Sequence, residues 1–179
     1  MRKLLFAFSI ALTGCASSFK YVPRVYPAGT RWEVGGVEVL LRDERQNVRA
    51  FPPPTAASPE FADVRLPPSF RDNVEFRVKD LATGSGPPVK VEIEVVKVRA
   101  GWERTWSSKN ERATVELWFR VFGRDGRLLI ESGESGSREF RSTDPSDQEL
   151  RAVLLAACGD AVDAFLTSTQ ASRAVNASR

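Results

Sequence analysis

The sequence contains no histidine and only two cysteines among its 179 residues. Without histidine, the chain cannot perform Ser-His-Asp or Cys-His catalysis, and it cannot form a zinc site with histidine ligands. Cys15 and Cys158 are too few for a disulfide framework or a cysteine-rich metal site. Carboxylates remain the only obvious acid–base groups, and we expect neither a metal site nor a cofactor.

The charges show no excess of one sign that would indicate a nucleic-acid partner. Lys and Arg number 26 against 23 Asp and Glu, and two of the basic residues, Arg2 and Lys3, lie at the extreme N-terminus. Without these two, 24 basic residues remain against 23 acidic ones. No basic stripe or block of like charge remains, so nucleic acid is not an expected partner.

The apolar run at residues 4–12 is too short to span a bilayer as a stable helix. It follows Arg2 and Lys3 and is interrupted only by Ser9, which is typical of a signal peptide. The next residues, Leu-Thr-Gly-Cys at 12–15, resemble the lipobox of bacterial lipoproteins. In that family, the cysteine thiol receives a diacylglyceryl group, the preceding peptide is removed and the new amine is acylated.

The lipobox resemblance implies a signal peptide at residues 1–14 and lipidation of Cys15. A plain secretory peptide with an incidental Cys15 and an uncleaved N-terminal helix are the alternatives. Ala16 is not Asp. By resemblance to proteobacterial lipoproteins, this implies sorting to the outer membrane of a Gram-negative cell, with the domain facing the periplasm.

After Cys15, the chain has the length of one domain. We expect a tether at residues 15–33, a single domain at residues 34–167 and a flexible polar tail at residues 168–179.

Alternating apolar residues predict four strands within this domain. The first lies around Val37, Val39 and Leu41, and the clearest covers residues 89–100. A change of phase at Val96 and Val98 indicates either a bulge or a strand buried on both faces near its end. Two more, at residues 113–122 and 127–140, are joined by the tight turn at residues 123–126 and complete a three-stranded meander.

Two segments have helical spacing. Residues 147–167 place apolar side chains, Cys158 among them, at intervals of three and four, so one face should pack on the sheet and bury an inert thiol. Residues 69–83 fit a helical stripe but also alternate as a strand would. The Pro-Ser entry and the exit at Gly84 favour a helix.

The predicted fold is α+β, with a small antiparallel sheet and helices packed on one face, in the order strand, helix, three-stranded meander, helix. Together with the lipobox, this order resembles small outer-membrane lipoproteins of the YajG-like group. Those proteins share their architecture with lipoproteins of lipopolysaccharide assembly and of some transporters. The Pro-rich insertion at residues 51–68 departs from that pattern, and the resemblance implies little about biochemical function.

Trp102, Arg104 and Trp106 form the candidate interaction surface, because an exposed Trp beside Arg is the composition of binding hot spots. The alternative is that both rings fold back over the sheet or pack together across the long hairpin. For two other tryptophans, we expect Trp118 to be covered by a helix, and Trp32 to lie at a headgroup surface or to pack on the sheet edge.

The expected function is that of a membrane-anchored, non-catalytic accessory or binding module for another envelope protein. An alternative is a periplasmic binder of an amphiphile or cell-wall glycan in a groove between sheet and helices. A remote alternative is a hydrolase that uses carboxylates such as Glu92 and Glu94, although these alternate with Lys90 on a face that should be solvated.

Overall fold

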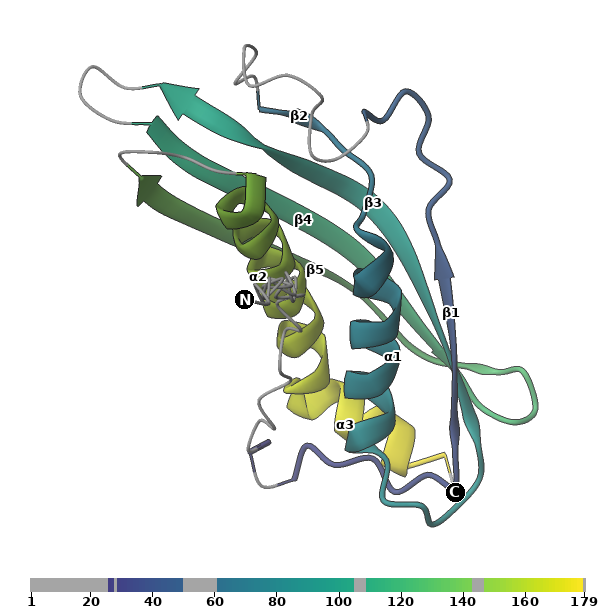
Figure 1. Cartoon of the computed structure of the whole chain (residues 1–179). Helices are drawn as coiled ribbons and strands as arrows, with labels where there is room; N and C mark the ends of the chain where they lie inside the picture. Colours follow the sequence, from purple (N-terminus) through teal and green to yellow (C-terminus); the bar gives the residue numbers. More distant parts are fainter. Residues whose placement is uncertain (1–25, 28, 50–60, 105–108, 143–146, 179) are drawn as a thin grey trace, which may run out of the picture.

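The computed structural model describes residues 26–27, 29–49, 61–104, 109–142 and 147–178 (Figure 1). Within these ranges, the elements are β1 (Val37–Arg42), β2 (Ala62–Asp63), α1 (Pro68–Leu81), β3 (Val89–Arg104), β4 (Lys109–Phe122), β5 (Leu128–Ser142), α2 (Asp147–Leu166) and α3 (Thr169–Asn176). The strands form one sheet, and Figure 1 shows the three helices on the same side of it. The predicted α+β fold is confirmed.

The sheet is mixed rather than purely antiparallel. Its order is β1-β3-β4-β5, and the short β2 pairs antiparallel with one end of β3. The meander of β3, β4 and β5 is antiparallel as predicted, but β1 pairs parallel with β3, with Val37 opposite Val89. Helix α1 supplies the crossover that a parallel pair requires, so the connection through α1 accounts for the direction of β1.

Of the two interpretations of the phase change, the bulge at Val96 is confirmed, and it sets which side chains are buried. The register between β3 and β4 shifts between Val95 and Lys97, and Val96 is 49% exposed. Alternate residues from Val89 to Val95 face the helices, and after the bulge Val98 continues the buried row. The extra residue therefore lets one long strand keep an apolar face toward the helices along its length.

The core lies between the sheet and the helices. The ring of Phe165 on α2 stacks on Phe119 of β4, with centroids 4.3 Å apart, and meets Trp32 edge to face at 6.0 Å. All three rings are fully buried. The predicted helical stripe of α1 is also confirmed, since its buried residues are Phe70, Val74, Val78 and Leu81.

The C-terminal segment predicted to be a flexible tail contains the helix α3. Ser168 caps it by accepting a hydrogen bond from the Ala171 backbone N–H, and Val175 on the same face is buried. Asn176 accepts a hydrogen bond from the Glu33 backbone N–H at 2.8 Å and donates one to the Arg31 carbonyl. The tail prediction is wrong because Ser168, Ala171 and Val175 together supply a cap and an apolar face.

The same contacts correct the end of the predicted tether. Trp32 is fully buried and forms a bridge with Ala82, just after α1. The Ser172 hydroxyl on α3 donates a hydrogen bond to the Thr30 carbonyl at 3.0 Å. Residues 30–33 therefore belong to the folded domain, and Trp32 packs in the core rather than at a headgroup surface. Residues 15–25 lie outside the described ranges.

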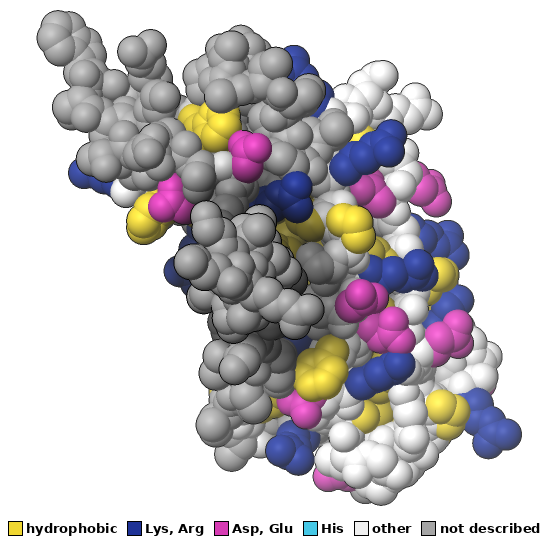
Figure 2. All heavy atoms as spheres, in the orientation of Figure 1, with side chains coloured by type: hydrophobic (Ala, Val, Ile, Leu, Met, Phe, Trp, Pro, Cys, Tyr) yellow, Lys and Arg dark blue, Asp and Glu magenta, His cyan; other side chains and the backbone are white. Residues whose placement is uncertain are grey.

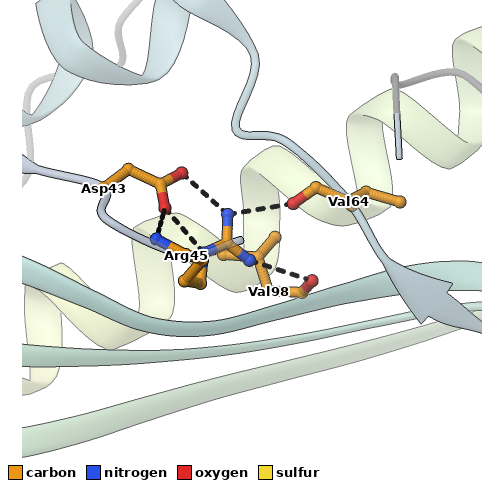
Figure 3. A network of polar contacts seen from close by, with 4 residues as sticks. All are labelled: Asp43, Arg45, Val64 and Val98. Atoms are coloured by element: carbon orange, nitrogen blue, oxygen red, sulfur yellow. Dashed lines mark hydrogen bonds and ion pairs between the residues drawn. The ribbon is translucent and has the colours of Figure 1, made fainter. Parts of the chain in front are cut away.

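Arg45 links the segment after β1 to the sheet through hydrogen bonds and an ion pair (Figure 3). Its guanidinium binds the Asp43 carboxylate through two contacts of 2.8 Å and donates to the carbonyls of Val64 and Val98 at 3.0 and 3.4 Å. The Arg45 side chain is only 12% exposed. One charged group therefore joins the loop after β1, the residue after β2 and the middle of β3.

This network predicts a pH-dependent contribution to stability. The hydrogen bond from Arg45 lowers the pKa of Asp43. The charged carboxylate therefore stabilises the fold above its unfolded-state pKa of about 3.9, and that contribution is lost as the pH falls through the lower folded-state pKa. We expect Asp43→Asn to reduce the free energy of unfolding by about 1–2 kcal/mol at neutral pH, and by less below about pH 4.

Urea unfolding at pH 7 and pH 3 measures the difference between Asp43→Asn and the unchanged chain. Asp72→Asn, at an exposed position of α1, is the matched control and should change stability little at either pH. An Asp43→Asn deficit of the same size at both pH values would contradict the assigned role of the carboxylate.

Candidate functional site

The side of the sheet opposite the helices carries the candidate site. We name it the open sheet face and define it by the alternate residues of β3, β4 and β5 that point away from the buried row: Lys90, Glu92, Glu94, Val96, Glu116, Trp118, Arg120, Phe122, Glu131 and Gly133. Figure 2 views the other side, over the helices, where charges of both signs are interspersed and exposed hydrophobic groups are scattered.

Trp118 lies at the middle of the open sheet face and is 36% exposed. It pairs with Glu94 on one side and with Gly133 on the other. A Cβ atom at Gly133 would lie 2.7 Å from Trp118 Cζ3, so the ring rests on the bare backbone of β5. The expected helix cover for Trp118 is wrong, because the opposite phase of β4, represented by Leu117 and Phe119, faces the helices.

Ion pairs surround Trp118 on the neighbouring positions of three strands. Arg120 lies 3.2 Å from Glu94 on β3 and 3.8 Å from Glu131 on β5. On the other side of the tryptophan, Lys97 bonds to Glu116 at 3.2 Å. These side chains are 38–51% exposed, and such pairs contribute little to stability, about 0–1 kcal/mol each. Their arrangement instead places a polar rim around an aromatic centre.

The carboxylates considered for hydrolysis lie on the same face. Lys90 donates a hydrogen bond to Glu92 at 2.8 Å and lowers the pKa of that carboxyl. A general acid in a glycosidase needs the opposite shift, which an apolar setting would produce. Glu94 is held by Arg120. Among the described residues, no group of three or more His, Cys, Asp or Glu side chains is placed to hold a metal ion.

Of the predicted interaction surface, Trp102 is the one residue whose side chain lies within the described part of the chain. Trp102 is 6% exposed, and its Nε1 donates to the Glu111 carboxylate at 3.4 Å. The alternative interpretation, a ring folded onto the sheet, therefore holds for Trp102. Arg104 ends β3, but its side chain is not described, and Trp106 and the lipidation candidate Cys15 lie outside the described ranges.

Trp102 is buried because of its phase along β3. After the bulge at Val96, the buried positions are Val98, Ala100 and Trp102, two residues apart. Trp118 has the reverse phase on β4. Of these two tryptophans, the one predicted to be covered is therefore exposed, and the one proposed as a contact is covered.

Cys158 is buried on α2 as predicted. Burial raises the pKa of its thiol to about 12, so it stays protonated and unreactive at neutral pH.

Two grooves lie at the edges of the sheet, and the larger one includes Lys90, Glu92 and Phe122 of the open sheet face. A groove of about 290 Å³ runs between β5 and α2, beside Phe140, Ala152 and Ala156. A larger one of about 850 Å³ lies beside β1, and its walls carry the Lys79–Glu75 and Lys90–Glu92 ion pairs. Apolar side chains, Val37, Val39 and Phe122 among them, line this groove together with the charged groups. No helix within the described ranges has the length and apolar character needed to cross a membrane.

No family model matches the sequence, and no curated protein matches it. Among solved structures, a DUF330 protein from Xanthomonas campestris has a TM-score of 0.50 and 15% identity, over 88% of this chain and 97% of that one. A minor lipoprotein from Acinetobacter baumannii has a TM-score of 0.42 and 10% identity, over 84% and 96% of the two chains. A neuraminyllactose-binding hemagglutinin homologue from Helicobacter pylori has a TM-score of 0.43 and 7% identity, over 89% of this chain and 98% of that one. The chain thus shares its fold with the Xanthomonas protein, and the finer resemblance to YajG-like lipoproteins stays a prediction.

Proposed function

We propose that the protein is a lipid-anchored lipoprotein of the bacterial envelope that binds another envelope protein and performs no catalysis of its own. The observation that carries the binding role is Trp118, which is 36% exposed at the centre of a face rimmed by ion pairs. Tryptophan is enriched at binding hot spots, where surrounding contacts exclude water from a central aromatic group.

The setting of Trp118 favours binding in a second way. Its ring rests on Gly133, and neighbouring strands fix its backbone on both sides. A side chain already held in place loses little conformational freedom when a partner covers it, so more of the contact energy contributes to affinity. The mixed charges of the rim would select a partner with a complementary pattern.

The anchoring role rests on the lipobox at residues 12–15. Acyl chains on Cys15 would each contribute about 0.8 kcal/mol per buried CH2, which is enough for firm attachment when two or more are present. Under this proposal, Ala16 directs the protein to the periplasmic side of the outer membrane. Metabolic labelling with a fatty acid should mark the chain and leave Cys15→Ala unmarked. Equal labelling of both chains would exclude this residue as the anchor.

Crosslinking in intact cells tests the binding role. A photoreactive residue placed at Val96, beside the pairing position of Trp118, should yield an adduct with one specific envelope protein. Trp118→Ala in the same chain should reduce that adduct roughly tenfold or more, the effect of losing a hot spot of about 2 kcal/mol.

The matched control is Phe76→Ala, which removes another exposed aromatic ring from α1, on the helix side of the molecule. It should leave the adduct unchanged. If Trp118→Ala and Phe76→Ala both give the same adduct yield as the chain that carries only the photoreactive residue, the open sheet face is not the binding surface.

A further inference from the structure

The strand β5 ends the sheet along a long edge. Within the described residues, it pairs only with β4, and it runs for 15 residues without a proline. The outward N–H and C=O groups of such an edge are a template for another strand. We propose that a second copy of this chain pairs antiparallel with β5, with Gly136 of both copies at the two-fold axis. This inference is independent of the function proposed above.

The charges along β5 select this register. About a two-fold axis at Gly136, residues equally distant on either side lie opposite each other and on the same face. Glu134 then meets the partner subunit's Arg138, and Glu131 meets the partner subunit's Arg141. Symmetry repeats each contact, so four pairs of opposite charge form.

Neighbouring registers lack this complementarity. An axis at Glu134 or at Arg138 places that residue against its own copy, and an axis at Ser135 places Glu131 against the partner subunit's Glu139. An axis at Ser137 brings no charges opposite each other. Like charges directly across a strand pair destabilise it, so the axis at Gly136 is favoured over those on either side.

The position of α2 leaves room for the second copy. The helix lies above the space between β4 and β5, because Phe165 stacks on Phe119 of β4 while Ala157 lies against Gly136 of β5. If the axis of α2 lies midway between β4 and β5, the two-fold symmetry places the partner's α2 about 10 Å from it. This is the separation of packed helices.

Small side chains line the flank of α2 that would face the copy. Ala152 and Ala156 border the groove beside Phe140, and Asp160, one turn on, binds Arg138 of β5 at 2.7 Å. Phe140 is 49% exposed in the single chain and would lie opposite the partner subunit's Ser132, with the second helix nearby. Pairing would therefore cover the apolar groove of about 290 Å³ and join the two open sheet faces into one surface.

Disulfide trapping tests the register. Ser135 lies opposite the partner subunit's Ser137 about this axis, and both are exposed. Full-length Ser135→Cys mixed with full-length Ser137→Cys should form a covalent dimer under mild oxidation, much faster than either variant alone. Ser135→Cys mixed with Glu139→Cys, two residues out of register, is the matched control. The unchanged chain, oxidised in the same way, measures any disulfide that Cys15 forms. Cys158 is buried and does not take part in disulfide exchange.

A charge exchange tests the contacts without added cysteines. Glu131→Arg and Arg141→Glu should each weaken dimerisation roughly tenfold, because two attractive pairs become repulsive, and the double variant should restore it. Sedimentation of the full chain measures the dissociation constant.

The proposal is overturned if the mixed cysteine variants trap no more dimer than the control mixture, or if the exchanged chain stays as weak as the single variants. A chain that remains monomeric in sedimentation, with β5 instead crosslinked to a different protein, would also overturn it.

Discussion

Phe165→Ala is expected to lower the free energy of unfolding by about 3–5 kcal/mol, the cost of replacing a buried Phe by Ala in a core that cannot close the cavity. Phe165 is fully buried and joins three parts of the chain. Its ring stacks on Phe119 of β4 and meets Trp32 from the segment before β1, so its loss would leave two large aromatic rings without their shared contact.

Urea unfolding followed by circular dichroism measures this loss. Phe76→Ala is the matched control, since Phe76 is 50% exposed on α1 and its removal should cost less than about 1 kcal/mol. A deficit for Phe165→Ala no larger than that of Phe76→Ala would show that the contact between α2 and β4 is not central to the fold.

The parts of the fold that the sequence predicts are those with a long periodic signal. The meander follows from alternation over β3, β4 and β5, and α2 follows from apolar spacing over twenty residues. The parallel pairing of β1 leaves no such signal, because the alternation of apolar residues in a six-residue strand is the same whether the strand pairs parallel or antiparallel. It depends on where α1 returns the chain, which only the packed structure determines.

The tryptophans show why the candidate site was harder to predict. The residue types around Trp102 favour a contact residue. Whether a strand residue is buried, however, depends on which face of the sheet it occupies. The bulge at Val96 places Trp102 on the same face as the buried Val98. A bulge was one of the two interpretations of the phase change. Continuing the alternation from Val98 to Trp102 under that interpretation would have indicated a buried ring. Trp118 was predictable from β4 alone, since Leu117 and Phe119 already define the covered face.

The Asp43–Arg45 network illustrates a limit set by geometry. Arg45 binds backbone carbonyls of Val64 and Val98, which any residue type would present. No residue pattern marks such an acceptor, because the contact depends on the loop after β1 approaching β3. Polar contacts of this kind become visible only when distant segments have been placed side by side.

Gly136→Ala is expected to destabilise the protein by about 2–3 kcal/mol, because α2 approaches β5 too closely for any side chain at this position. A Cβ atom there would lie 1.9 Å from the Ala157 carbonyl oxygen and 2.9 Å from the Ala161 backbone nitrogen. Both obstacles are backbone atoms of a helix, so the helix as a whole must move away from the sheet. That movement would also disturb the stacking of Phe165 on Phe119.

The control for this substitution is Gly36→Ala, where an added Cβ would have no atom within 4 Å. Replacing Gly by Ala at an unstrained position usually stabilises a protein by about 0.4–1 kcal/mol, because the unfolded chain loses freedom. The two variants carry the same chemical change, so opposite signs in their unfolding free energies would isolate the effect of the helix contact. Equal changes would mean that α2 can shift at no cost and that the close approach to β5 does not hold it in place.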